Sequence, residues 1–77
     1  MDIRKLILDE IRSLAFVQLD VNDSIIESQL LDSIGLIDLV IFIEEITGID
    51  IPANDINKTN FDSVNKIIDY LHTREKD

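Results

Sequence analysis

The sequence predicts an all-α protein, a small irregular four-helix bundle of three main helices and one short helix, in a single domain that covers residues 1–77. Three observations lead to this prediction. Several segments repeat apolar residues at the three- and four-residue spacing of one helix face. Apolar residues make up 45% of the chain, and two Gly and one Pro indicate ordered chain rather than linker. A length of 77 residues leaves no room for a second domain.

The first predicted helix covers residues 2–15. Asp2 is a suitable N-cap, because its carboxylate can accept hydrogen bonds from the free N–H groups of the first turn. Charged residues occupy one face of this helix, and the other face is apolar, as expected of a helix that packs on a core. The apolar face carries Ile3, Leu6, Ile7, Ile11 and Leu14.

Residues 16–32 predict a long ordered loop. Apolar residues occur there without a clear period, and we expect them to hold the loop against the core. Loops of this length are uncommon in compact domains and are often functional. Residues that favour turns and caps are frequent in the segment, namely Asp20, Asn22, Asp23, Ser24 and Ser28.

The second predicted helix runs from Ile34 to about Thr47, with Ser33 as its N-cap and Gly48 as its stop. One continuous apolar face is formed by Leu36, Leu39, Val40, Ile43 and Ile46. One face suffices to bury a helix in a small bundle, so a second apolar stripe requires another use. That stripe consists of Ile34, Ile37 and Ile41, bordered by Asp38, Glu44 and Glu45.

The rest of the chain predicts a short helix and a last main helix. Pro52 marks a turn, and residues 54–58 are expected to form a single helical turn. Asp62 and Ser63 are expected to cap the last helix. Residues 73–77 are expected to be frayed. The inner face of the last helix carries Val64, Ile67, Ile68 and Leu71, with Tyr70 near its edge.

The charge of the chain is strongly acidic and unevenly spread. Sixteen acidic residues against seven basic ones give a net charge of −9, and no Lys or Arg occurs between Arg12 and Lys58. Such a field repels nucleic acid and anionic lipid and steers basic protein surfaces toward the domain. The alternative is that the acidity serves solubility alone.

The composition excludes several kinds of site. The absence of Cys removes disulfides and thiolate metal sites, and His72 alone cannot build a zinc site. A calcium loop that begins at Asp20 fails, because Ile25 stands where Gly is needed and Leu31 where the bidentate Glu is needed. No apolar stretch is long enough to cross a membrane, and the charged start lacks a secretory signal. We therefore expect no metal, no membrane insertion and a cytoplasmic protein.

Ser33 stands between the long loop and the second helix, where its hydroxyl is expected to be exposed. Taken alone, the pair Asp32-Ser33 is explained by helix capping. Its surroundings, from Leu30 to Val40, resemble the attachment motif of the acyl and peptidyl carrier protein family, whose hallmark is Asp-Ser-Leu at the head of the second helix. Ile34 replaces the Leu here. The resemblance covers essentially the whole chain, including segments 44–52 and 63–71.

The resemblance implies the carrier-type bundle and a covalent cofactor. Ser33 is expected to be esterified by 4'-phosphopantetheine from coenzyme A, through a separate magnesium-dependent phosphopantetheinyl transferase. The thiol of this arm is expected to hold acyl or aminoacyl cargo as a thioester. The phosphodiester suits a helix N-terminus, whose N–H groups and dipole favour an anion. Asp32 opposes that effect, so we interpret Asp32 as recognition or metal positioning in the transferase complex rather than as stabilising.

The resemblance also gives the second apolar stripe a use. Carrier proteins of this type present the corresponding helix face to partner enzymes, so Ile34, Asp38, Ile41 and Glu45 are expected to form a docking surface. An apolar stripe with a carboxylate rim suits apolar patches that carry Arg or Lys. The alternative is that Ile37 and Ile41 pack under the long loop, and Ile37 is expected to turn toward the core or a cargo pocket.

Gly35 departs from the fatty-acid carriers, which usually have an acidic residue at this position. The Leu-Leu-Asp-Ser opening is more similar to carriers of amino acids, including D-alanyl carriers, and favours aminoacyl cargo. The expected partners are the transferase, a loading enzyme and a downstream transferase or synthase, each acting on a stand-alone monomeric carrier.

An enzymatic function is not expected. A serine nucleophile needs an activating base, and the lone His72 lies in the last helix. Glu44 and Glu45 are adjacent, so they diverge on a helix and do not converge on one substrate atom. The rival hypothesis is an unmodified acidic helical adaptor, in which Ser33 is only a helix N-cap.

Overall fold

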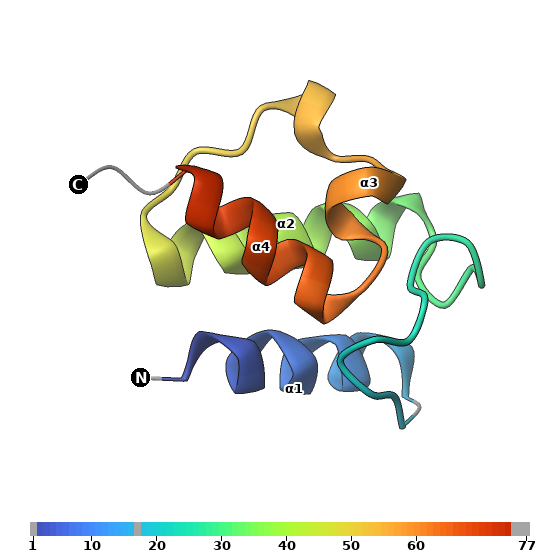
Figure 1. Cartoon of the computed structure of the whole chain (residues 1–77). Helices are drawn as coiled ribbons and strands as arrows, with labels where there is room; N and C mark the ends of the chain where they lie inside the picture. Colours follow the sequence, from blue (N-terminus) through green and yellow to red (C-terminus); the bar gives the residue numbers. More distant parts are fainter. Residues whose placement is uncertain (1, 17, 75–77) are drawn as a thin grey trace.

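The computed structural model describes residues 2–16 and 18–74, and within them it confirms an all-helical bundle without strands (Figure 1). Three long helices and one short helix are present, as predicted. The elements in chain order are α1 (Ile3–Ala15), α2 (Ser33–Thr47), the 3-10 turn η1 (Ala53–Asp55), α3 (Lys58–Phe61) and α4 (Val64–Arg74).

The core forms where α1 packs against α2 and α4, and α3 packs against α4. Every helix contributes fully buried side chains, and burying each of them stabilises the fold by about 1.5–3 kcal/mol. Phe61 from α3 lies against Tyr70 from α4, with ring centroids 5.4 Å apart. The fully buried residues of the helices are Ile7, Ile11, Leu39, Ile43, Phe61, Val64 and Ile67.

α1 has the two caps that position its ends. Asp2 accepts a hydrogen bond from the Lys5 N–H at 3.2 Å, which confirms the predicted N-cap. At the other end Phe16 adopts the left-handed conformation, with φ 59°, and its N–H donates to the Arg12 carbonyl. For a residue with a Cβ this conformation costs about 1–2 kcal/mol, and Gly normally occupies it. The Phe16 side chain is nevertheless 90% exposed.

The loop that joins α1 to α2 is ordered in the described segment 18–32, and Leu19 and Ile25 anchor it in the core. Its central polar anchor is Asp62, which is buried between α3 and α4. The Asp62 carboxylate accepts hydrogen bonds from the Ile26 N–H at 2.7 Å and from the Glu27 N–H at 2.9 Å. The Ser24 hydroxyl donates to the same oxygen at 2.9 Å.

The prediction that Asp62 and Ser63 both cap α4 is wrong for Asp62. Ser63 performs this task, because its hydroxyl oxygen accepts the Lys66 N–H at 3.1 Å. The Asp62 carboxylate points to the loop instead, and the Asp62 carbonyl accepts the Ile25 N–H. Asp62 therefore fixes the segment that leads into α2.

The short elements lie slightly away from their predicted places. The helical turn expected at residues 54–58 is divided between η1 and α3, and Asn57 separates them by accepting the Asn60 N–H at the head of α3. Asn57 favours capping over the helix interior for the same reason that Asn favours turns.

The end of α4 and the place of Tyr70 also differ from expectation. Thr73 and Arg74 belong to α4, contrary to the predicted fraying, and Arg74 donates to the Asp50 carbonyl. Residues 75–77 lie outside the described residues. Tyr70, expected near the edge of α4, is buried, and its hydroxyl donates to Asp55 at 2.6 Å. Among the helices described, none is long and apolar enough to cross a membrane.

Candidate functional site

Ser33 is the first residue of α2, and Asp32 is its N-cap. Asp32 has an extended backbone, and its Oδ1 accepts the Gly35 N–H at 2.8 Å. The prediction that Ser33 caps the helix is therefore wrong. The interpretation of Asp32 as a residue without a stabilising role is also wrong, because its carboxylate satisfies an N–H group that would otherwise lack a partner in the helix.

The Ser33 side chain is exposed. Within residues 2–16 and 18–74 its hydroxyl makes no hydrogen bond, since the capping bond of α2 comes from Asp32. The local structure therefore does not use this hydroxyl, and a second molecule can approach it. A Ser hydroxyl that is neither buried nor bonded is a suitable acceptor for a group brought by another protein.

His72, the one His of the sequence, does not lie beside Ser33 where it could act as a base. His72 lies with Ile46 and Thr47 around a pocket at the opposite end of α2. The 15 residues of α2 extend over about 21 Å, so His72 and Ser33 are too far apart to exchange a proton. Among the described residues, no group of three or more His, Cys, Asp or Glu is arranged to hold a metal ion.

Gly35 allows the end of the loop to approach α2 closely. A Cβ at this position would lie 3.3 Å from Asp32 Oδ1 and 3.3 Å from a methyl group of Leu31. Both contacts are tighter than ordinary van der Waals distance, so a larger residue would push against the capping carboxylate. Position 35, where Gly replaces the acidic residue usual in fatty-acid carriers, is thus also the position that the capping carboxylate of Asp32 approaches closely.

A hollow of about 470 Å³ lies beside Ser33, between the end of α1 and the start of α2. Because α1 and α2 run in opposite directions (Figure 1), Ala15 of α1 and Ile34 of α2 line the same hollow. We call it the α1–α2 hollow. Its lining is mixed, because Asp32 and Asp38 bring carboxylates and Gln29 an amide. The rest of the lining comes from Leu14, Leu30, Leu31 and Gly35.

The second stripe of α2 is exposed as a continuous surface. The exposed fractions are 71% for Ile34, 55% for Ile37 and 49% for Ile41. The alternative in which Ile37 and Ile41 pack under the loop is therefore wrong. Of the two places expected for Ile37, the core or a cargo pocket, the exposure excludes the core. The reason is that only the side of α2 that carries Leu39 and Ile43 is buried in the core of the bundle.

The acidic border of the stripe has two kinds of member. Asp38 and Glu45 are exposed, as a docking rim requires. Glu44 is half-buried, and its carboxylate accepts the Ile51 N–H at 2.8 Å, so it fastens the chain that follows α2. The structure therefore brings the predicted residues Ser33, Ile34, Asp38, Ile41 and Glu45 onto one helix, with Asp32 directly before it.

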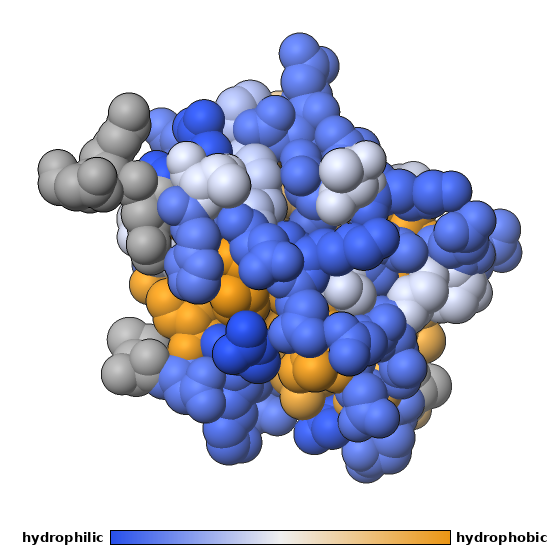
Figure 2. Space-filling view, in the orientation of Figure 1, coloured by the Kyte–Doolittle hydropathy of each residue, from blue (hydrophilic) through white to orange (hydrophobic). Residues whose placement is uncertain are grey.

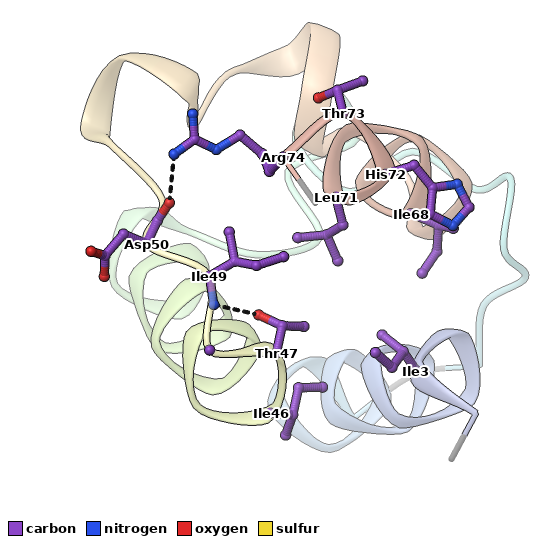
Figure 3. A pocket seen from close by; sticks show the side chains of 11 residues that line it. Ile3, Ile46, Thr47, Ile49, Asp50, Ile68, Leu71, His72, Thr73 and Arg74 are labelled. Carbon is purple, nitrogen blue, oxygen red and sulfur yellow. Dashed lines mark hydrogen bonds between the residues drawn. The ribbon is translucent and has the colours of Figure 1, made fainter. Parts of the chain in front are cut away.

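A larger pocket of about 750 Å³ lies at the other end of the bundle, where α1 begins and α2 and α4 end. Figure 3 shows the apolar side chains that line it, namely Ile3, Ile46, Ile68 and Leu71 from these helices and Ile49 from the chain that follows α2. Figure 2 shows apolar surface at the same end. Sequence reasoning missed this pocket, because its walls come from segments that are far apart in the chain.

Two pKa shifts report the polar anchors of the fold. Burial raises the pKa of Asp62, but the hydrogen bonds from Glu27, Ile26 and Ser24 together outweigh burial, so that its pKa is lowered below the ordinary value. For Tyr70, burial first and then the hydrogen bond to Asp55 raise the pKa to about 12. Asp62 is therefore charged, and Tyr70 neutral, at physiological pH.

No protein-family model matches the chain, and no curated protein matches it significantly. The site must therefore be interpreted from its own geometry: a free serine hydroxyl at a helix start, next to an exposed apolar stripe with an acidic rim. Such an arrangement suits the transfer of a group to Ser33 by a separate protein.

Because Asp32 and not Ser33 caps α2, we expect the alanine variants of these two residues to differ in stability. We expect Asp32→Ala to lower the free energy of unfolding by about 1 kcal/mol, because the Gly35 N–H loses its acceptor. Ser33→Ala is expected to change it by less than about 0.5 kcal/mol, because the hydroxyl has no partner to lose. Urea unfolding followed by circular dichroism measures both values. A larger loss of unfolding free energy for Ser33→Ala than for Asp32→Ala would show that Ser33, and not Asp32, caps the helix.

Proposed function

We propose that this protein is a carrier that holds acyl or aminoacyl cargo as a thioester on a 4'-phosphopantetheine arm attached to Ser33. The observation that carries the proposal is the exposed Ser33 hydroxyl at the first turn of a helix that Asp32 already caps. Because the fold does not need this hydroxyl, an explanation of Ser33 by helix capping no longer applies. The resemblance of the Leu30–Val40 segment to the carrier attachment motif supports the same residue.

The residues around Ser33 fit a phosphodiester-linked arm. The Asp32 carboxylate accepts a hydrogen bond from the Gly35 N–H, and the Asp32 carbonyl accepts one from the Leu36 N–H. The N–H groups of Ser33 and Ile34 precede these bonded positions and remain available to an anion at the helix start. The α1–α2 hollow, whose lining combines apolar and polar side chains, lies next to the attachment point. The arm would supply the thiol, which the chain itself lacks because it has no Cys.

The transfer itself would be carried out by a phosphopantetheinyl transferase. A bond forms between Ser33 Oγ and the phosphorus that carries the pantetheine of coenzyme A, and the pyrophosphate bond of coenzyme A breaks. The adenosine bisphosphate half leaves, and the Ser33 proton passes to a base of the transferase. The carrier would therefore be a substrate and cargo holder and not an enzyme.

The partners would dock on the exposed surface of α2. Ile34 and Ile41 supply apolar contact, and Asp38 and Glu45 supply a carboxylate rim that favours surfaces with Lys and Arg. In addition to the transferase, the proposed partners are a loading enzyme and a downstream transferase or synthase, which would meet a monomeric carrier in the cytoplasm. Aminoacyl cargo is favoured by the Leu-Leu-Asp-Ser opening.

A second candidate is an unmodified acidic adaptor that binds proteins through the same surface. The exposed stripe of Ile34, Ile37 and Ile41 favours it, because an apolar surface of this kind suits protein contact in either function. The adaptor leaves the exposure of the Ser33 hydroxyl without a role. Modification of Ser33 separates the two functions.

The proposed function predicts complete dependence of cofactor uptake on one residue. Purified protein is incubated with coenzyme A, magnesium and a broad-specificity phosphopantetheinyl transferase, and its intact mass is recorded. The wild type is expected to gain one phosphopantetheine and Ser33→Ala none. Ser13→Ala, which removes an exposed hydroxyl from α1, serves as the matched control and is expected to be modified fully. A well-folded wild type that gains no mass would favour the adaptor.

A further inference from the structure

Phe16 is the most exposed large hydrophobic residue in the described part of the chain. Its exposed fraction is 90%, and the other exposed large hydrophobic residues there are Ile34, Ile37 and Ile41 of the α2 stripe. Single exposed apolar residues are common on protein surfaces. Here, however, the other three all belong to the α2 surface that the proposed function already uses, and Phe16 lies outside it.

The conformation of Phe16 shows that folding does not require a phenylalanine there. The residue ends α1 in the left-handed conformation, with φ 59°, where Gly or Asn is favoured. The bond that it makes as a cap comes from its backbone N–H, which donates to the Arg12 carbonyl. Any residue except Pro supplies that N–H. The aromatic ring therefore gives neither a favourable backbone nor a buried contact.

The position of Phe16 places it at the Ser33 end of the molecule. Phe16 directly follows Ala15, which lines the α1–α2 hollow together with Ile34. The end of α1 and the first turn of α2 thus border one surface, at the right-hand end of the bundle in Figure 1. Asp32 and Asp38 also line this hollow, and no Lys or Arg occurs in the sequence between Arg12 and Lys58.

We propose that Phe16 is an aromatic anchor which inserts into an apolar pocket, rimmed by Lys or Arg, on the transferase that modifies Ser33. This inference rests on the proposed function. A protein that reaches the Ser33 hydroxyl must cover the surface around it, and the carboxylates there select a cationic partner. Aromatic side chains in desolvated pockets are frequent sources of binding energy at protein interfaces. The docking surface then extends from α2 across the hollow to the end of α1.

The test compares two substitutions that keep the α1 cap. Phe16→Asn retains a residue that tolerates the left-handed conformation and removes the apolar ring. Phe16→Leu retains apolar bulk. The initial rate of phosphopantetheine transfer by the same broad-specificity transferase is measured against the concentration of each apo-protein. We expect Phe16→Asn to lower kcat/KM about tenfold or more, through a higher KM at unchanged kcat, and Phe16→Leu to lower it by less than about threefold.

Thermal unfolding separates an anchor from a structural residue. Phe16→Asn is expected to melt at the wild-type temperature or above it, because the substitution relieves the backbone conformation. Equal kcat/KM for Phe16→Asn and the wild type would overturn the anchor, as would a lower melting temperature that accounts for the slower transfer. Self-association of the wild type that Phe16→Asn abolishes would also overturn it and assign Phe16 to a contact between two copies. If the wild type itself takes up no phosphopantetheine, the proposed function fails instead.

Discussion

Asp62→Ala is expected to lower the free energy of unfolding by about 3–5 kcal/mol, the largest stability loss that we predict for a polar residue. The buried carboxylate accepts three hydrogen bonds, from the N–H groups of Ile26 and Glu27 and from the Ser24 hydroxyl. Hydrogen bonds to a charged group contribute about 1.5–3 kcal/mol each. Because the donors are only partly buried, water replaces some of the lost bonds, and the total loss is smaller than the sum of the three. A domain of this size has about 4–12 kcal/mol in total, so the variant should be close to unfolding.

The loss should be measured by urea unfolding at neutral pH, with Asp69→Ala as the matched control. Asp69 is an exposed residue of the same helix that begins after Asp62, and its replacement should change the unfolding free energy by less than about 0.5 kcal/mol. An unfolding midpoint for Asp62→Ala within the range of this control would show that the loop is held by its apolar residues alone.

The contribution of Asp62 should also disappear in acid. Its pKa is lowered in the folded protein, so its stabilisation is fully present above the unfolded-state pKa of about 3.9. It is lost as the pH falls through the lower, folded-state pKa. The difference in unfolding free energy between the wild type and Asp62→Asn is therefore expected to be constant above about pH 5 and to shrink below about pH 4.

Reversing two charges on α2 is expected to give the largest kinetic effect of any surface substitution. The double variant Asp38→Lys with Glu45→Lys should lower kcat/KM for phosphopantetheine transfer about 100-fold at low salt. Both side chains are exposed beside the apolar stripe, so the fold should remain intact. The wild-type rate should fall as ionic strength rises, because salt screens the attraction, whereas the variant rate should not fall.

A second double variant separates the local surface from the total charge. Asp50→Lys with Asp69→Lys changes the net charge by the same amount, from −9 to −5, since each substitution adds two positive charges to the net value in the sequence. Asp50 lines the pocket at the opposite end of α2, and Asp69 lies on α4. We expect this control to lower kcat/KM less than about fivefold. Equal losses of kcat/KM in the two double variants would show that the total charge of the protein, and not the α2 surface, determines the rate.

The sequence predicts the long helices well because their apolar spacing is strictly local. Ile7 and Ile11 on α1, and Leu39 and Ile43 on α2, follow the three- and four-residue period and are fully buried. The exposure of the second stripe is only half predictable in this way. The spacing identifies the stripe, but which of its residues stay exposed depends on the side of α2 that the rest of the bundle covers.

The details at the candidate site depend on contacts that the sequence pattern does not contain. Asp32 and Ser33 are both good capping residues in adjacent positions, and local preference cannot decide between them. The observed cap depends on the close approach of Leu31 and Asp32 to Gly35. The bonds of Asp62 to the loop join residues 35 to 38 positions apart in the chain, so no local rule predicts them.

The site of modification is the most direct test of the carrier function. After incubation with coenzyme A, magnesium and the transferase, cleavage after Glu27 and Glu44 releases the peptide 28–44, which contains both Ser28 and Ser33. The Ser28 hydroxyl already donates to the Ser24 carbonyl at 2.6 Å, whereas Ser33 is free to react. Tandem mass spectrometry of this peptide should place one phosphopantetheine on Ser33 and none on Ser28. An unmodified peptide from well-folded protein, or an arm on any other residue, would contradict the account.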